Sequence, residues 1–284
     1  MEENLNAARS GDPGAARTIA LLFPGQGSQS ADMRENVEAQ RPDLLALAGS
    51  EVSEDLFERA AEGTRWAQPA IFCAALAGYE ILKDRFDAGL MAGHSLGEIS
   101  ALVAAGAIEA EDGLRLVAAR GRLMQEAAEE TGDGGMLVVR ARERAPVEEV
   151  AEATGLAFAN DNAPDQIVLS GAIASLDEAE RLLGERRVRA KRLPVAGAFH
   201  SPLMEPAVEP FRELVEQTPV SEPSVPVMSC VTAAPFEDVR GQLVEAITRP
   251  VRWTDVLRAL QARDATHFVE TGPGKVLTGL AQKT

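Results

Sequence analysis

The stretch from residue 87 to residue 105, DAGLMAGHSLGEISALVAA, decides the fold of this chain. Its first part, Asp87–Ala92, is short and apolar and predicts a buried strand. Gly93 then marks a turn, and the run Leu96–Ala105 has the composition of a helix. A strand, a glycine turn and a helix in succession are typical of an α/β sheet.

The turn contains the pattern GxSxG, as Gly93-His94-Ser95-Leu96-Gly97. Between a strand and a helix, this pattern indicates a nucleophile elbow, which exposes the serine hydroxyl at the end of the strand. Backbone N–H groups at the start of the helix can stabilise an oxyanion. We therefore expect Ser95 to be a nucleophile; the alternative is a serine that only caps the helix.

A serine at its free pKa is a poor nucleophile and needs a base, and the chain has three histidines. His94 adjoins Ser95, and neighbouring side chains usually diverge at a sharp turn. His267 opens the apolar run HFVE, which favours a structural role at the end of a strand. His200 lies in the loop GAFHSPLM, and catalytic groups concentrate on loops. By elimination, His200 is the predicted base.

The rest of the chain divides into two parts. Apolar runs predict a strand at 18–23 and helices at 68–86 and 110–129, with Pro69 in the first turn of the helix at 68–86. From Gly134 the expected order becomes β-α-β-β-α-β within about sixty residues, which is the ferredoxin-like order. We expect a flexible leader at 1–16, a large subdomain formed by 17–133 and 198–284, and a small ferredoxin-like subdomain at 134–197.

The composition limits the class of protein. The 284 residues are 45% apolar and 25% charged, as in globular proteins. No apolar run approaches the ~20 residues that a membrane crossing needs, and the N-terminus lacks the pattern of a secretory signal. Two cysteines, Cys73 and Cys230, have neither a disulfide-framework nor a metal-ligand spacing. We therefore expect a cytoplasmic protein without a metal, and we read both cysteines as core thiols.

Six motifs occur together and in a fixed order across residues 18–282. They are FPGQGSQ (23–29), AQPA (67–70), GHSLGE (93–98), RGRLMQEA (120–127), AFHSPLM (198–204) and ETGPGKVLTGL (270–280). With them the chain resembles the malonyl-CoA:acyl-carrier-protein transacylases and the acyltransferase domains of polyketide synthases. The resemblance implies an α/β-hydrolase-like core with an inserted ferredoxin-like small subdomain. One departure is Ala31-Asp32-Met33 after GQGSQ, where the family commonly has Gly-Met.

The resemblance also implies roles for individual residues. Ser95 would attack the thioester of an acyl-CoA, with His200 as general base and then general acid. A backbone carbonyl would orient His200, and the matching position is Arg252 in PVRW. The backbone N–H groups of Leu96 and Gln26 would form the oxyanion hole. The substrate pocket would include Gln68 and His94.

Arg120 and Phe199 bear on the substrate. Arg120 matches the arginine that binds the free carboxylate of malonyl groups, and a guanidinium can pair with a carboxylate through two hydrogen bonds. The other interpretation is a solvated helix arginine like Arg122. Phe199 in AFH matches a position where the family has Phe for malonyl and Ser for methylmalonyl. A ring there would fill the space of a 2-methyl group, which favours malonyl.

The resemblance therefore implies a malonyl-CoA:acyl-carrier-protein S-malonyltransferase that acts without a cofactor. Malonyl-CoA would acylate Ser95, and the phosphopantetheine thiol of an acyl carrier protein would take the malonyl group. One alternative is an acyl hydrolase acting on carrier-bound groups, and another is a non-catalytic module that binds carrier proteins. We expect a free-standing monomer, although a piece of a larger synthase would look the same. The motifs fit fatty-acid and polyketide synthesis equally.

The net charge of the chain excludes some classes of partner, but a local cluster of charge is needed to identify the partner. The 28 basic and 44 acidic side chains give a net charge of −16, which disfavours nucleic acid and anionic membranes. Carrier proteins are typically acidic, so they too need a local basic surface. The run RRVRAKR supplies one through Arg186, Arg187, Arg189, Lys191 and Arg192. We predict that these residues steer the carrier protein; the alternative is a solvated helix end.

Overall fold

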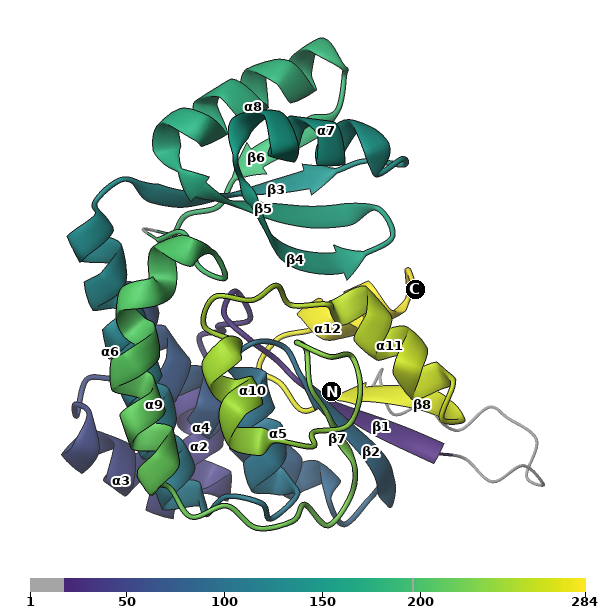
Figure 1. Ribbon diagram of the computed structural model, residues 1–284. Helices are drawn as coiled ribbons and strands as arrows, with labels where there is room; N and C mark the ends of the chain where they lie inside the picture. Colours follow the sequence, from purple (N-terminus) through teal and green to yellow (C-terminus); the bar gives the residue numbers. More distant parts are fainter. Residues whose placement is uncertain (1–17, 196) are drawn as a thin grey trace.

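The computed structural model describes residues 18–195 and 197–284, so the predicted leader at 1–16 lies outside the described residues. The chain forms two subdomains, each built on its own four-stranded sheet. Figure 1 shows the small subdomain above the large one. The predicted α/β fold, with a smaller antiparallel subdomain inserted in it, is confirmed.

The sheet of the large subdomain is parallel throughout. Its strands are β1 (Thr18–Phe23), β2 (Ala88–Gly93), β7 (Val227–Met228) and β8 (Ala265–Glu270), in the order β7-β2-β1-β8. The last residues of β1 and β2, Phe23 and Gly93, are paired. Because parallel strands end at the same edge, the loops after β1 and β2 lie side by side.

Helices lie on both faces of this sheet, and further helices pack on these. They are α2 (Met33–Gln40), α3 (Pro42–Glu51), α4 (Thr64–Leu82), α5 (Gly97–Ala104), α6 (Ala110–Thr131), the 3-10 helix η1 (Pro202–Ala207), α9 (Val208–Gln217), α10 (Val239–Glu245), α11 (Trp253–Gln261) and α12 (Val276–Ala281). Helix α4 is buried along most of its length and forms the centre of the main core. Among the described helices, none combines the length and apolar character that a membrane crossing requires.

Two expectations about the helices change. Helix α4 begins at Thr64, so Pro69 lies inside it rather than in its first turn. The helix starts earlier because the N–H groups of Trp66 and Ala67 bond the carbonyl of Gly63, at its N-cap. Helices α2 and α3 were not predicted, because each is short and buries only two residues.

The small subdomain follows the predicted order. Its elements are β3 (Gly134–Arg140), α7 (Ala145–Thr154), β4 (Ala157–Ala163), β5 (Gln166–Ala172), α8 (Ile173–Glu185) and β6 (Arg189–Arg192). The antiparallel strand order β4-β5-β3-β6 is that of a ferredoxin-like sheet. In Figure 1, α7 and α8 lie on the face turned away from the large subdomain.

Strand β4 joins the two subdomains. The Val251 N–H donates to the Ala159 carbonyl at 2.8 Å, and the Asp161 N–H donates to the Val251 carbonyl at 2.9 Å. The Asp161 carboxylate also accepts from Arg144 at 2.9 Å and from the Thr254 hydroxyl at 2.9 Å. These bonds place β4 against the start of α11, close to the edge where β2 ends.

Gly78 gives a test of how tightly α4 packs. A Cβ at Gly78 would lie 1.6 Å from the Thr271 carbonyl oxygen, so Gly78→Ala must move backbone. We expect a loss of roughly 1–3 kcal/mol in the free energy of unfolding, measured by urea denaturation. The control is Gly184→Ala in α8, which has open space and should stabilise by about 0.5–1 kcal/mol. Equal effects of the two changes would contradict this packing.

Candidate active site

Ser95 lies at the sharp turn between β2 and α5. Its backbone φ is +55°, in the left-handed region that a non-glycine residue adopts at a cost of about 1–3 kcal/mol. Glycines make the turn possible, because a Cβ at Gly93 would lie 1.9 Å from the backbone of Gly97. A Cβ at Gly97 would lie 2.2 Å from the Phe23 carbonyl oxygen. The predicted elbow is therefore present, with the Ser95 hydroxyl at the end of the strand.

His200 meets Ser95 from the loop before η1. Its Nε2 lies 2.8 Å from Ser95 Oγ. Its Nδ1 lies 2.9 Å from the Ala246 carbonyl oxygen and 3.1 Å from the Arg249 carbonyl oxygen. A carbonyl only accepts hydrogen bonds, so Nδ1 carries the ring hydrogen and Nε2 is left to accept from the Ser95 hydroxyl. This is the geometry in which a histidine removes a serine proton.

The carbonyls that orient His200 correct one expectation. We expected the carbonyl of Arg252, but that oxygen accepts the Val256 N–H at 2.9 Å in the first turn of α11. Ala246 instead ends α10 as its C-cap, where helix carbonyls lose their intrahelical partners, and Arg249 lies in the turn that follows the helix. Arg252 itself pairs through its side chain with Asp255 at 2.8 Å.

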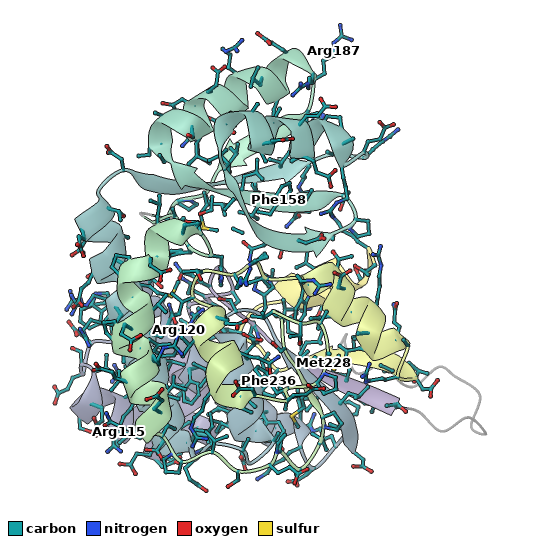
Figure 2. All side chains as sticks on the ribbon, viewed as in Figure 1. Arg115, Arg120, Phe158, Arg187, Met228 and Phe236 are labelled. Atoms are coloured by element: carbon teal, nitrogen blue, oxygen red, sulfur yellow. The ribbon has the colours of Figure 1, made fainter. Side chains whose placement is uncertain are left out.

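Arg120 reaches the same serine from α6. Its guanidinium donates to Ser95 Oγ at 3.1 Å and to Gln68 Oε1 at 2.8 Å. The Gln68 amide donates in turn to Thr64 Oγ1 at 2.9 Å, which fixes its orientation. Arg120 is 3% exposed, so the interpretation as a solvated helix arginine is wrong. Figure 2 shows Arg120 among the helices of the large subdomain.

Burial, together with the charge of Arg120, sets the ionisation of the site. Burial lowers the pKa of Arg120 to about 10, and the nearby Glu98 opposes that change. At neutral pH the guanidinium is therefore still charged. Burial, and then the charge of Arg120, lower the pKa of His200 to about 3. His200 is thus a neutral imidazole at neutral pH, which is the form that can accept a proton.

Two backbone N–H groups are the candidates for the oxyanion hole. Leu96 directly follows it, and Gln26 follows Gly25, whose Cβ would lie only 2.5 Å from the His94 carbonyl oxygen. The loop after β1 is therefore packed on the elbow. Neither the Leu96 nor the Gln26 N–H donates to another residue that the structure describes. Both donors remain available to an oxyanion beside Ser95.

The remaining predicted residues surround this centre. His94 turns to the small subdomain, where its Nε2 lies 2.8 Å from Asn162 Oδ1 on β4, and its ring contacts the edge of Trp253. Phe199 is 9% exposed and packs in the main core, beside Ala128 of α6. His267 lies early in β8, paired with Ile19, away from Ser95.

Sequence reasoning missed several groups at the site. No residue type identifies a carbonyl, so Ala246 and Arg249 left no signal. Asn162 lies in the polar stretch DNAPDQ (161–166), which has no strand pattern, yet β4 continues into it as far as Ala163. Glu98 stands inside the motif GHSLGE, where a glutamate in the first turn of a helix is favoured by the helix dipole alone and need not be buried. In the structure its side chain is only 1% exposed, and no residue of the motif indicates this burial.

The described part of the chain offers no metal centre, and its best-formed apolar cavity lies away from Ser95. No group of three or more His, Cys, Asp or Glu side chains there is placed to hold a metal ion. A largely apolar cavity of about 290 Å³ lies between α2, α4 and the loop after β8. Its lining includes none of Ser95, Arg120 and His200. We place the candidate active site at these three residues, because their hydrogen bonds support a reaction and the apolar lining of the cavity does not.

A serine on a strand–helix elbow, a neutral histidine within hydrogen-bond distance and two unused backbone donors define a serine acyl-transfer site on an α/β core. The family model "Acyl transferase domain" matches residues 20–284. The chain therefore belongs to the acyl transferase domain family.

Named relatives fall within the same family. The chain is 37% identical to the malonyl CoA-acyl carrier protein transacylase of Bacillus subtilis, over 93% of this chain and 90% of that protein. It is 39% identical to the polyketide biosynthesis protein ThaF of Burkholderia thailandensis, over 98% of this chain but only 26% of ThaF. A solved complex of a type II polyketide synthase acyl carrier protein with its malonyl-transacylase matches with a TM-score of 0.85 and 32% identity, over 94% of this chain and 92% of that one.

The ionisation of His200 can be measured directly. We expect its imidazole to stay neutral from about pH 8 to about pH 5, whereas an ordinary histidine titrates in that range. The unfolded chain does protonate this histidine, so His200 contributes stability above its ordinary pKa of 6.5 and loses it as the pH falls. NMR of ¹⁵N-labelled histidine, assigned with a His200→Asn variant, checks this. A midpoint near 6.5 for His200 would contradict the buried geometry.

Proposed function

We propose that this chain transfers a malonyl group from malonyl-CoA, through an acyl-enzyme on Ser95, to the phosphopantetheine thiol of an acyl carrier protein. The observation that carries the proposal is Arg120, a buried cation 3.1 Å from the candidate nucleophile. A guanidinium so close to the acylated atom fits an acyl group that ends in a carboxylate. The names of the relatives point to the same transfer.

The first half-reaction uses the bonds around Ser95. His200 Nε2 takes the hydroxyl proton while Ser95 Oγ attacks the thioester carbonyl, and the N–H groups of Leu96 and Gln26 stabilise the oxyanion. Each such donor is typically worth ~2.7–4 kcal/mol in the transition state. The Ala246 and Arg249 carbonyls stabilise the imidazolium that forms. His200 then gives the proton to the departing CoA sulfur.

The second half-reaction reverses these steps with another thiol. The neutral His200 takes the proton of the carrier's thiol, whose sulfur attacks the malonyl ester, and the proton returns to Ser95 Oγ. Arg120 holds the malonyl carboxylate during both steps, with Gln68 fixing one edge of its guanidinium. Phe199 favours malonyl over its 2-methyl derivative in this proposal. No cofactor takes part.

Two other functions would use the same fold. An acyl hydrolase for uncharged chains gains nothing from a buried cation, and Arg120 therefore disfavours it. A module that only binds carrier proteins would not need the bond between Ser95 and His200. A cytoplasmic location and a monomeric state stay predictions.

Loading with radiolabelled malonyl-CoA tests the proposal. We expect a stable adduct on the wild-type protein that passes to a phosphopantetheinylated carrier protein, and no adduct on Ser95→Ala. Arg120→Ala should lower malonyl loading by on the order of 100-fold or more, because a buried carboxylate would lose its partner. The same variant should still accept uncharged acyl groups.

Arg122→Ala is the matched control for Arg120→Ala. Arg122 lies on the same helix, but its guanidinium is exposed and pairs with Glu126. It should load malonyl at the wild-type rate. Rapid release of free malonate would support the hydrolase instead, and the absence of any adduct would support the non-catalytic module.

The basic run is a proposed docking surface for the carrier protein. Arg192 pairs with Asp177 and Glu180, and Arg186 pairs with Glu149. Arg189 and Lys191 are exposed on β6, the edge strand of the small sheet, and make no ion pair among the described residues. Figure 2 shows Arg187 at the far end of the small subdomain from Arg120, so docking should centre on β6 rather than on Arg187.

Charge reversal tests the docking surface. The double variant Arg189→Glu with Lys191→Glu should slow transfer to the carrier by roughly 3- to 10-fold at low salt, because such charges act on the association rate. Its salt dependence should weaken, while loading from malonyl-CoA is retained. The control reverses Arg85 and Arg263, which are exposed. These residues precede β2 and β8, at the end of the large sheet away from Ser95. Equal behaviour of the two double variants would refute the docking surface.

A further inference from the structure

Glu98 is a buried acid that the mechanism above does not use. It lies in the first turn of α5, three residues after Ser95, and is 1% exposed. Its Oε1 accepts the Cys230 N–H at 2.6 Å, whereas its Oε2 is buried and meets no donor in hydrogen-bond geometry among the described residues, although the Ser229 hydroxyl lies near enough to lower the pKa of the acid. A buried carboxylate oxygen without a donor is costly, so this oxygen needs an explanation.

The neighbours of Glu98 include one charge. Cys230 and Ser229 face it from the loop after β7, and Arg120 acts on it from α6. Burial raises the pKa of the Cys230 thiol, and this thiol donates to the Gly93 carbonyl, so it stays neutral. Among the described residues, Arg120 is therefore the charged group whose electrostatic interaction lowers the pKa of Glu98.

Arg120, in turn, is a buried cation without a directly paired carboxylate among the described residues. It hydrogen-bonds only neutral groups, Gln68 Oε1 and Ser95 Oγ, and forms no ion pair with an acid that the structure describes. Glu98 is the acid whose negative charge raises the pKa of Arg120. A substrate carboxylate on Arg120 would then place two anions around one buried cation, which disfavours ionisation of both.

We infer that Glu98 is a positioning residue: it supplies the counter-charge of Arg120 in the unloaded enzyme and takes up one proton when a substrate carboxylate pairs with Arg120. The inference rests on the proposed malonyl specificity. The proton comes from solvent and binds Glu98 Oε2, and no other bond of Glu98 changes. Burial raises the pKa of Glu98 to about 7 in the unloaded site, so the proton uptake can occur near neutral pH.

The sign of the pH effect follows from linkage. Below about pH 6, Glu98 is protonated with or without substrate, and the Michaelis constant for malonyl-CoA should not depend on pH. Above about pH 7, Glu98 is ionised in the unloaded enzyme and must take up a proton on loading. The Michaelis constant should therefore rise by on the order of 30-fold between about pH 6 and about pH 8.5, while kcat changes little.

Glu98→Gln separates charge from shape. The amide keeps an oxygen for the Cys230 N–H but cannot take up a proton. We expect its Michaelis constant to be flat with pH and close to the low-pH value of the wild type. Glu130→Gln is the control, since Glu130 is exposed on α6 and in no ion pair among the described residues. It should keep the wild-type pH profile.

Proton uptake is the second readout. Mixing the enzyme with malonyl-CoA in weak buffer with an indicator dye, near about pH 8, should show uptake approaching one proton per site for the wild type and for Glu130→Gln. Glu98→Gln should show none. If the adduct forms but wild type and Glu98→Gln share one profile and take up no proton, the inference is wrong while the proposed function stands. If wild type forms no adduct, the proposed function itself fails.

Discussion

The buried guanidinium of Arg120 is the constraint on which the rest of the site depends. A charge at 3% exposure must find partners, and it finds Gln68 Oε1 and Ser95 Oγ rather than a carboxylate. Its positive field helps to hold His200 neutral, the form in which the imidazole can act as a base. The same cation therefore orients the nucleophile, prepares the base and leaves one strong site for an anion.

Close packing brings these groups together from distant parts of the chain. The glycines of the elbow let the loop after β1 rest on the turn after β2, with Gly25, the residue before Gln26, against the His94 carbonyl. The C-cap of α10 and the turn after it supply the two carbonyls that fix the tautomer of His200. Strand β4 reaches across from the small subdomain, where Asn162 bonds His94 next to the nucleophile. Each subdomain thus contributes to one centre.

The sequence predicts this centre to different depths. The elbow and the ferredoxin-like order follow from local periodicity and turn residues, and the structure has both. His200 follows from elimination, because the chain has only three histidines. The orienting carbonyls were assigned wrongly to Arg252, since a backbone oxygen carries no residue-type signal and its use depends on where a helix ends. Glu98 could not be identified as buried, because exposure depends on packing between α5 and the loop after β7.

A crystal structure of the enzyme with a malonyl group trapped on Ser95 tests the role of Arg120 most directly. We predict that the malonyl carboxylate lies on the Arg120 guanidinium, beside Gln68, and that the ester carbonyl oxygen lies within hydrogen-bond distance of the Leu96 and Gln26 N–H groups. A malonyl carboxylate turned away from Arg120, toward solvent or the small subdomain, would contradict the central role of that residue.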